Sequence, residues 1–315
     1  MILPKFAYIR PKTIKNALQH FQEHEGNAPY LSGGTDLVPR MKQRLIKPSA
    51  VIDLKGIKDL NKIEISRSWL KIGANINLYD LKNHSFVKDT LPVLADSLDA
   101  TSCETLQMRG TIGGNLLQDT RCLFYNKSEE WRKAKGYCIK MGGHICNAAK
   151  GAKICSANYA SDNAPALIAL GAYVNIAGND GNQQMPLEAI FSGKSVLPFT
   201  LLPGEILTHI MIPIKKTRGC YLKARVRDSV DYPVVGVALS LVEGKGCISV
   251  GAIGAKPLQF DFDENESGWV ERIAQEVIDC AHPLANTVLS AAYRKKMAGV
   301  LVKRLARKLT EEISR

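Results

Sequence analysis

Four of the eight cysteines in this chain fall between residues 122 and 155, where they follow the spacing C-x15-C-x7-C-x8-C. Thiolates gathered at one place can bind zinc or an iron–sulfur cluster. Structural zinc sites bring cysteines in pairs about two to four residues apart, and bacterial ferredoxins use a similarly tight run, but neither pattern occurs here. The spacing alone therefore leaves three alternatives open: an iron–sulfur cluster, zinc, or thiols without a ligand.

Two features of this cysteine segment, residues 122–155, favour a metal centre. A polar insertion of about 40 residues inside a compact domain needs an internal organiser, because long loops without regular structure are uncommon. Basic side chains in the segment would offset the negative charge of a cluster, or would simply solvate a surface loop: Lys127, Arg132, Lys133, Lys135, Lys140 and Lys153. His144 could replace one thiolate, but we expect it to face solvent. The other cysteines lie singly in helix or strand patterns, and we expect them to be small buried residues: Cys103, Cys220, Cys247 and Cys280.

Two glycine-rich stretches, residues 32–36 (SGGTD) and 110–114 (GTIGG), each follow an apolar segment. Consecutive backbone N–H groups with little side-chain obstruction can cradle a pyrophosphate. No G-x-G-x-x-G fingerprint occurs, and residues 193–195 (GKS) end no P-loop because Glu188 stands where its first glycine is required. The residues therefore predict a large phosphorylated cofactor clamped between two loops, bound differently from a nicotinamide dinucleotide in a Rossmann fold.

The elements expected to position these loops alternate between helix and strand. Thr13 is a candidate N-cap for a helix over 12–24, and Asp162 is one for a helix over 164–170. Further strands are expected over 28–31, 50–54, 69–74, 173–176, 220–227, 235–242 and 247–254. Further helices are expected over 78–83, 91–104, 267–280 and 288–312. This pattern predicts an α+β protein with a boundary between residues 203 and 216.

Composition excludes several classes of protein. The chain has 315 residues, 45% of them hydrophobic, which suits two or three domains with real cores. It has no apolar run long enough to span a membrane and no signal sequence, so we expect a cytoplasmic protein. The net charge is +12, but no nucleic-acid motif accompanies it. Eight of the last 22 residues, from Arg294 onward, are basic, and we expect them on the outer face of the last helix.

The chain resembles the flavoprotein (medium) subunits of the molybdenum hydroxylase family along essentially its whole length. The resemblance rests on residues 32–37 (SGGTDL), 72–74 (IGA), 111–116 (TIGGNL), 161–167 (SDNAPAL), 203–207 (PGEIL) and 293–294 (YR). It implies a two-subdomain FAD-binding fold of the PCMH (vanillyl-alcohol oxidase-like) type, followed by a C-terminal α+β domain of the CO dehydrogenase flavoprotein type. The implied divisions are residues 1–55, residues 56–210 with an insertion at about 117–157, and residues 215–315.

The resemblance also implies the residues that bind FAD. The glycine loops would hold the pyrophosphate, Asp162 the ribityl and phosphate region, and Lys223 would approach the isoalloxazine. The full expected set is Leu31, Ser32, Gly33, Gly34, Thr35, Asp36, Thr101, Gly110, Thr111, Ile112, Gly113, Gly114, Asn115, Asp162, Leu207 and Lys223. No catalytic residue is expected, because no acid–base pair or nucleophile triad accompanies these loops.

Most of the family lacks the cysteine segment, but the β subunits of 4-hydroxybenzoyl-CoA reductases form a branch that has it. This chain resembles that branch at residues 118–122 (QDTRC), 136–138 (GYC) and 223–228 (KARVRD). The resemblance implies that Cys122, Cys138, Cys146 and Cys155 ligate a [4Fe–4S] cluster. It implies a subunit that relays electrons from a ferredoxin-like donor through that cluster and FAD to a [2Fe–2S] small subunit and a molybdenum large subunit, where the CoA thioester is reductively dehydroxylated to benzoyl-CoA.

Three other functions remain alternatives at this point. The chain could be the FAD subunit of another molybdenum hydroxylase that acts on a different aromatic or CoA-thioester substrate. It could be a self-sufficient FAD oxidase or dehydrogenase of the same fold. It could also bind anions or nucleic acid around a structural zinc.

Overall fold

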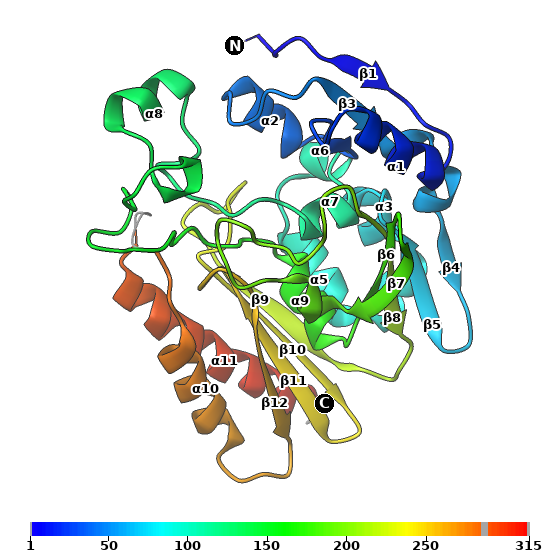
Figure 1. Ribbon diagram of the computed structural model, residues 1–315. Helices are drawn as coiled ribbons and strands as arrows, with labels where there is room; N and C mark the ends of the chain where they lie inside the picture. The colour runs from blue at the N-terminus through cyan, green and yellow to red at the C-terminus, as the bar shows by residue number, and fades with distance from the viewer. Residues whose placement is uncertain (1, 285–288, 314–315) are drawn as a thin grey trace.

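The computed structural model describes residues 2–284 and 289–313, and within them the chain folds around three β-sheets (Figure 1). The N-terminal sheet is parallel, in the order β1 (Ala7–Ile9), β3 (Ala50–Asp53), β2 (Tyr30–Leu31). Helix α1 (Ile14–Glu23) begins where expected, because the Thr13 hydroxyl accepts a hydrogen bond from the Asn16 backbone N–H at 3.1 Å. Helix α2 (Leu37–Lys42) starts immediately after the first glycine loop.

The middle sheet is antiparallel and has the order β4-β5-β8-β6-β7. Its strands are β4 (Ile63–Ile65), β5 (Trp69–Gly73), β6 (Tyr173–Gly178), β7 (Gly181–Pro186) and β8 (Ile206–Pro213). The helices between β5 and β6 are α3 (Leu78–Asn83), α4 (Ser85–Thr90), α5 (Pro92–Ala100), α6 (Glu104–Gln107), α7 (Ile112–Leu116), α8 (Glu129–Lys135) and α9 (Asn163–Ala169). Short 3-10 helices lie at Leu54–Gly56, Lys58–Asn61, Ile139–Met141 and Leu187–Ile190.

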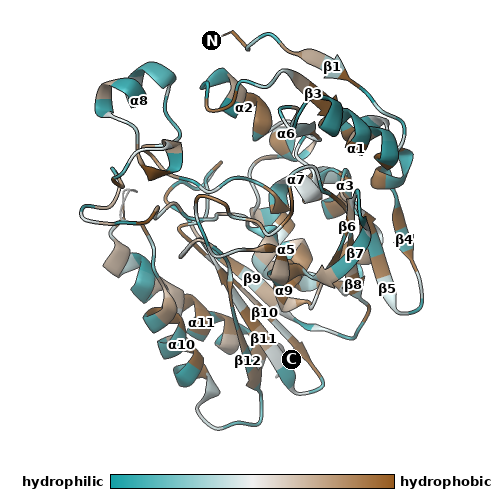
Figure 2. Ribbon diagram, in the orientation of Figure 1, coloured by the Kyte–Doolittle hydropathy of each residue, from teal (hydrophilic) through white to brown (hydrophobic). Residues whose placement is uncertain are grey.

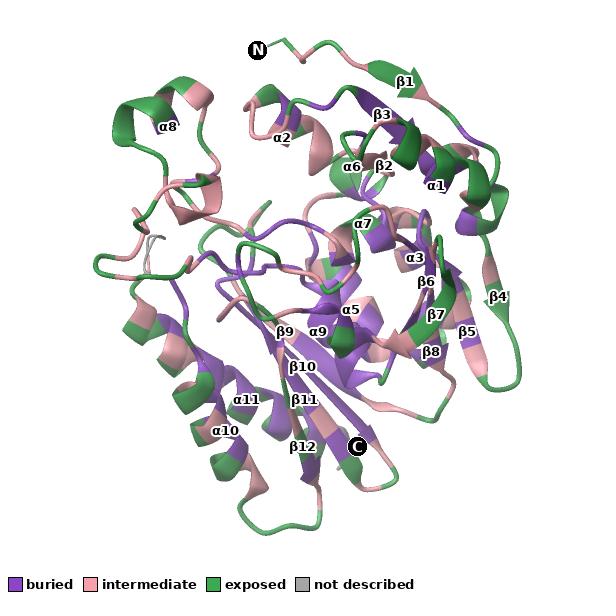
Figure 3. Cartoon of the chain, viewed as in Figure 1, coloured by how far each residue is buried: buried purple, intermediate pink, exposed green. Residues whose placement is uncertain are grey.

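The C-terminal sheet is a four-stranded antiparallel layer in the order β12-β11-β10-β9. Its strands are β9 (Arg218–Ala224), β10 (Val235–Val242), β11 (Lys245–Gly251) and β12 (Leu258–Asp263). Val237 and Leu239 pack with helices α10 (Trp269–Cys280) and α11 (Ala291–Ile313), whereas Ala238, between them, packs with the core that contains α5 and α9. Strand β10 is therefore buried on both faces, which Figure 3 shows, and Figure 2 shows hydrophobic residues along the same strands.

The structure confirms the α+β class, and several differences have local causes. The expected helix over 91–104 is broken, because Ser102 adopts a left-handed backbone (φ 58°) between α5 and α6. Strands β1, β4, β7, β8 and β12 were not predicted, and the expected start of the last helix at residue 288 lies outside the described residues. Cys280 is exposed rather than buried, and Arg294 is buried rather than outward-facing. The domain boundaries stay a prediction.

The cysteine segment projects from the fold between two paired backbone positions. Arg121 and Asn158 form an isolated antiparallel bridge, with N–H to carbonyl distances of 2.7 and 3.1 Å. The chain between them carries α8, which projects beside the N-terminal layer in Figure 1. No helix in the described ranges is long and apolar enough to cross a lipid bilayer.

Candidate cofactor site

The two glycine loops meet face to face, although about 75 residues separate them in the sequence. A Cβ atom at Gly33 would lie 2.0 Å from the Arg109 carbonyl oxygen, so only glycine permits this approach. Polar side chains join the loops as well: the Ser32 hydroxyl lies 2.5 Å from Asn75 Oδ1 and 2.8 Å from Thr111 Oγ1. The two loops therefore form one continuous surface.

The second loop is held against residues 74–78 by backbone hydrogen bonds. The Leu78 N–H donates to the Gly110 carbonyl at 2.8 Å, and the Gly113 N–H donates to the Ala74 carbonyl at 2.9 Å. Gly113 has no room for a side chain, because a Cβ atom there would lie 2.7 Å from that of Ala74. Gly114 is different: an added Cβ would crowd the Thr111 hydroxyl, at 2.9 Å, but beyond its chain neighbours and its own helix backbone no other atom of the described chain would lie within 4 Å of it.

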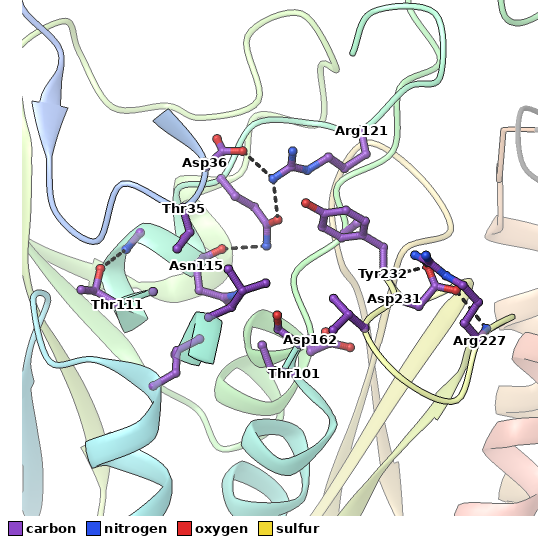
Figure 4. Close-up of a pocket in the computed structure, with 18 residues that line it drawn as sticks. Thr35, Asp36, Thr101, Thr111, Asn115, Arg121, Asp162, Arg227, Asp231 and Tyr232 are labelled. Carbon is purple, nitrogen blue, oxygen red and sulfur yellow. Dashed lines mark hydrogen bonds and ion pairs between the residues drawn. The ribbon is translucent and has the colours of Figure 1, made fainter. Parts of the chain in front are cut away.

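Two hollows lie on either side of the glycine loops, with empty volumes of about 910 and 820 Å³. The first, bounded by Tyr30, Asn75 and Leu207, faces the N-terminal sheet. The second reaches the C-terminal domain and is shown in Figure 4. Both are lined by Thr35, Asp36, Thr111 and Gly114. The loops thus cross the middle of a long groove, which suits an extended ligand with a pyrophosphate at its centre.

A buried polar cluster supports the wall of the second hollow. Asp162 accepts hydrogen bonds from the Tyr221 hydroxyl at 2.8 Å and from Lys223 Nζ at 3.0 Å. Burial raises the pKa of Asp162, and the Lys223 ammonium opposes that shift. Asp162 occupies the predicted N-cap position of α9, but its carboxylate makes no capping hydrogen bond, and the Ser161 hydroxyl accepts from the Ala164 N–H at 3.0 Å instead.

Arg121 lies at the point where the glycine loops, the C-terminal domain and the cysteine segment come together. Its Nη2 atom lies 2.5 Å from Asp36 Oδ1 and 3.3 Å from Gln118 Oε1, and its guanidinium carbon lies 4.7 Å from the centre of the Tyr232 ring (Figure 4). Cys122 follows Arg121 directly in the sequence. One side chain therefore connects the cofactor groove with the first thiol.

The four clustered cysteines line one small cavity with an empty volume of about 280 Å³, together with Phe124, Tyr125, Ile139 and Lys140. In the described part of the chain these thiols form no disulfide, and each is half-buried. Burial raises the pKa of the Cys155 thiol. Across the described ranges, no three His, Cys, Asp or Glu side chains already stand close enough to form a ready metal site. The thiols face a common space without forming a closed ligand shell.

Most of the residues expected to bind FAD line one hollow or the other. They are Ser32, Gly33, Gly34, Thr35, Asp36, Thr101, Gly110, Thr111, Gly113, Gly114, Asn115, Asp162 and Leu207. Leu31, Ile112 and Lys223 line neither hollow. Ile112 is buried in the main core, and Lys223 Nζ donates to Asp162 and to the Ala100 and Asp231 carbonyls. A role of Leu31, Ile112 and Lys223 in cofactor binding stays a prediction. Lys223 would act indirectly, by holding the Asp162 carboxylate that lines the second hollow.

Sequence reasoning missed Asn75, Arg121 and Tyr232 as members of the site. Asn75 follows the apolar stretch of β5, and its amide both meets Ser32 and donates to the Leu54 carbonyl at 2.9 Å. Arg121 was quoted in a motif but given no role. Tyr232 comes from a loop of the C-terminal domain that no pattern placed near the groove. Each residue reaches the site through long-range packing, which a local pattern does not report.

The comparisons of this chain with known proteins agree on one family. The family model described as FAD binding domain in molybdopterin dehydrogenase matches residues 4–215. The FAD-binding subunit PaoB of an aldehyde oxidoreductase from Escherichia coli K12 is 29% identical over 94% of this chain and 97% of its own length. The carbon monoxide dehydrogenase medium chain from Afipia carboxidovorans is 26% identical over 96% of both chains.

Solved structures have the same fold. A chain of the Cu,Mo-CO dehydrogenase, in its cyanide-inactivated form, aligns with a TM-score of 0.78 at 24% identity over 98% of this chain and 99% of that one. A chain of quinoline 2-oxidoreductase from Pseudomonas putida 86 aligns with a TM-score of 0.77 at 21% identity over 99% of both. At these identities the likeness concerns the fold alone, and it confirms the expected fold type.

Proposed function

This chain belongs to the family of FAD-binding domains in molybdopterin dehydrogenases, and on that premise we propose that it is the electron-relay flavoprotein subunit of a molybdenum-dependent reductase. The family match confirms the expectation of an FAD-binding subunit of the molybdenum hydroxylase family. The relatives are subunits of oxidoreductases and dehydrogenases, so the expectation of an oxidoreductase subunit is confirmed as well. The cofactors, partners and substrate beyond this level are the content of the proposal.

The residues of the groove fit FAD. Gly33 and Gly113 let the loops pack closely against Arg109 and Ala74, and Gly114, which lines both hollows, adds no side chain where a pyrophosphate would lie. The Thr35 and Thr111 side chains lie on the same surface and can donate hydrogen bonds to phosphate oxygens. The apolar side chains of Leu106 and Leu207 stand in opposite hollows, where they can cover the faces of a flat ring. FAD would supply a carrier that takes up two electrons and releases them one at a time.

The four thiols supply the type and number of ligands that a [4Fe–4S] cluster needs, and the cavity that they line together carries the proposal. Cysteines from four points of one segment line a single cavity, next to the buried ammonium group of Lys140. Cluster ligation by four cysteines would organise a stretch, residues 142–156, that contains no helix or strand in the described chain. Lys140 would then stabilise negative charge at the thiolates, and the aromatic rings of Phe124 and Tyr125 would limit access of water.

The finer proposal is that the complex is a 4-hydroxybenzoyl-CoA reductase. The residues around Cys122 and Cys138, and residues 223–228, support it through their resemblance to that branch of the family. The subunit would accept electrons from a ferredoxin-like donor and pass them to a [2Fe–2S] small subunit and a molybdenum large subunit, where the phenolic hydroxyl leaves. A complex that acts on another aromatic or CoA-thioester substrate is the alternative.

The test is co-expression of the chain with its partner subunits, followed by anaerobic purification. Reduced ferredoxin should support conversion of 4-hydroxybenzoyl-CoA to benzoyl-CoA by the complex, and the isolated chain should convert none. Turnover of another aromatic thioester in place of this one would move the assignment to the alternative. Turnover by the isolated chain would contradict the relay role.

A further inference from the structure

The cysteine segment follows the second glycine loop closely in sequence, and in space it also contacts the end of the first loop and α2, which lie far from it in sequence. Its contacts concentrate on residues 36–44, which comprise the end of that loop, α2 and the residues after it. Arg121 and Arg132 make these contacts directly, and Lys140 reaches Arg40 of α2 through the Asp119 carboxylate that both cations share. This arrangement ties the thiol cavity to the floor of the cofactor groove.

The Arg121–Asp36 ion pair is the most direct connection. The carboxylate belongs to the last residue of the glycine loop, and the guanidinium belongs to the residue before the first thiol. Both side chains are largely covered, with 23% and 21% of their surface exposed, so water screens the pair only in part. Asp36 also accepts a hydrogen bond from the Asp119 backbone N–H at 3.4 Å. Because a carboxylate would repel a phosphate, the Asp36 side chain is suited to positioning the loop through Arg121.

Lys140 makes a second connection from inside the cysteine segment. Its ammonium group, 5% exposed, lies 2.5 Å from Asp119 Oδ1, while Arg40 of α2 lies 3.2 Å from Asp119 Oδ2. Lys140 also stands 4.6 Å from the centre of the Tyr125 ring at the wall of the thiol cavity. Asp119 is thus shared by one cation beside the thiols and one cation on the helix that follows the glycine loop.

Arg132 of α8 makes the third connection. Its Nη2 atom donates to the Gln43 and Arg44 carbonyls, both at 3.2 Å, at the C-terminal end of α2. A guanidinium at this position satisfies carbonyls that the helix leaves without partners. Arg132 is only 3% exposed, and removal of its side chain would take this donor from the two partly buried carbonyls. Helix α2 is therefore held at its C-terminal end by α8 of the cysteine segment and at its N-terminal end by Arg121, the residue that precedes this segment.

We propose that the thiol cavity and the FAD groove are energetically coupled through these contacts, with the Arg121–Asp36 pair as the main link. Occupation of the thiols by an iron–sulfur cluster fixes residues 122–155, and that segment in turn fixes Asp36 and α2 in the conformation that binds the pyrophosphate. This inference rests on the proposed function, since it presupposes both cofactors. It adds an order of assembly: the chain binds FAD tightly only after the cluster is in place.

Linkage makes the coupling reciprocal and measurable. If the cluster raises the affinity for FAD by a given factor, FAD must raise the affinity for the cluster by the same factor. Couplings between protein sites commonly amount to about 5- to 150-fold. A value of about 10-fold is reasonable here, because one partly covered ion pair and two buried contacts carry it.

The experiment measures the dissociation constant of FAD by fluorescence titration of the flavin-free chain. Wild type and the Arg121→Gln variant are each titrated with the iron–sulfur cluster present and after its anaerobic removal by a chelator. In wild type, cluster removal should weaken FAD binding by about 10-fold. The ratio of the two dissociation constants, without and with the cluster, should fall towards one in Arg121→Gln. In Arg121→Lys, which keeps the positive charge, the ratio should stay between that of Arg121→Gln and that of wild type. Arg272→Gln is the matched control, because Arg272 pairs with Glu266 and Glu276 on the exposed side of α10, and its ratio should equal that of wild type.

A ratio of one in wild type, or the wild-type ratio in Arg121→Gln, would overturn the proposal. Hydrogen exchange of residues 37–42 in the flavin-free wild-type chain gives an answer that needs no variant: exchange should be slower with the cluster present, and equal rates would also overturn it. Cofactor content is measured first. A wild-type chain that contains no iron or no FAD refutes the proposed function itself, whereas a chain with both cofactors but no coupling refutes this inference alone.

Discussion

Lys223 and Asp162 form an ion pair behind the wall of the cofactor groove, with 3.0 Å between Nζ and Oδ2 and only 4% and 6% of the two side chains exposed. The ammonium also donates to the Ala100 and Asp231 carbonyls, so it joins α5 to the loop that carries Tyr232. The pair thus supports the groove from outside.

Lys223→Met should be strongly destabilising, because it leaves the Asp162 carboxylate buried without its cation. The expected loss in the free energy of unfolding is about 3–5 kcal/mol. The double variant Lys223→Met with Asp162→Asn should lose less than the single variant. Urea denaturation measures both losses.

The exposed pair of Lys71 and Glu64, also 3.0 Å apart, provides the control. Lys71→Met should cost about 1 kcal/mol or less. Equal losses for Lys223→Met and Lys71→Met would show that burial of the Lys223 pair contributes nothing.

Gly114→Val should deplete FAD while the fold survives. The new side chain would meet only the Thr111 hydroxyl and would project into the space that both hollows share. Flavin content per folded chain, with thermal unfolding of the same sample, measures the effect. Gly254→Ala is the control, because its nearest neighbour would be the Lys256 carbonyl oxygen at 3.9 Å. Normal flavin content in Gly114→Val would remove this glycine from the site.

Gly33→Ala should instead damage the fold locally and lose FAD as a consequence. The added methyl group would fall on the Arg109 carbonyl oxygen and force the two glycine loops apart. Both the thermal unfolding temperature and the flavin content should drop. A stable Gly33→Ala variant with full flavin would contradict the close approach of the loops.

Cys138→Ser should remove iron from the chain and, through the coupling to α2, weaken FAD binding by about 10-fold. Cys280→Ser is the control, because this thiol is exposed on α10 and lies outside the cysteine cavity. Iron, acid-labile sulfide and flavin should be measured on each sample. Full retention of iron in Cys138→Ser would refute its assignment as a ligand.

Arg294→Met should destabilise the junction between the C-terminal domain and the groove. Its guanidinium donates to the Val234, Leu284 and Ala252 carbonyls, and burial lowers its pKa to about 10. Loss of these bonds takes this donor from the Val234 and Leu284 carbonyls, while the Ala252 carbonyl keeps a hydrogen bond from the Asn158 amide, so the cost should be about 2 kcal/mol or more. Lys296→Met, at an exposed position of the same helix, should change the free energy of unfolding little. Similar losses for both variants would contradict a positioning role for Arg294.

The parts of the fold that could be predicted are those with a local signal. Thr13 marks the start of α1 and the apolar run of β10 marks a strand, because capping and hydrophobic patterns act over a few residues. Strand β7 (GNQQMP) lies at the edge of its sheet, where it pairs with β6. Its residues are mostly polar and exposed, and this composition does not predict a strand. The sequence pattern placed Arg294 on the outer face of a basic helix. In the structure the side chain is buried, and it donates hydrogen bonds to three backbone carbonyls from other segments.

The same distinction holds in the site. Two stretches with paired glycines predict phosphate-binding loops, because glycine lets the backbone N–H groups approach a ligand without obstruction by side chains. The link between Asp36 and Arg121 could not be foreseen, since the two residues lie 85 positions apart and either charge also suits a solvated surface. The contacts of Arg132 with the Gln43 and Arg44 carbonyls, and the Asp119 carboxylate shared by Lys140 and Arg40, likewise join segments that no local pattern places together.

The most direct test of the central claim is a cofactor analysis of the native chain, purified without oxygen. A relay subunit predicts one FAD, with about four iron atoms and about four acid-labile sulfides per chain. Its spectrum should show flavin peaks over a broad absorbance that reducing agents bleach. A chain with flavin but no iron or sulfide would contradict the cluster, and a colourless chain would contradict the whole account.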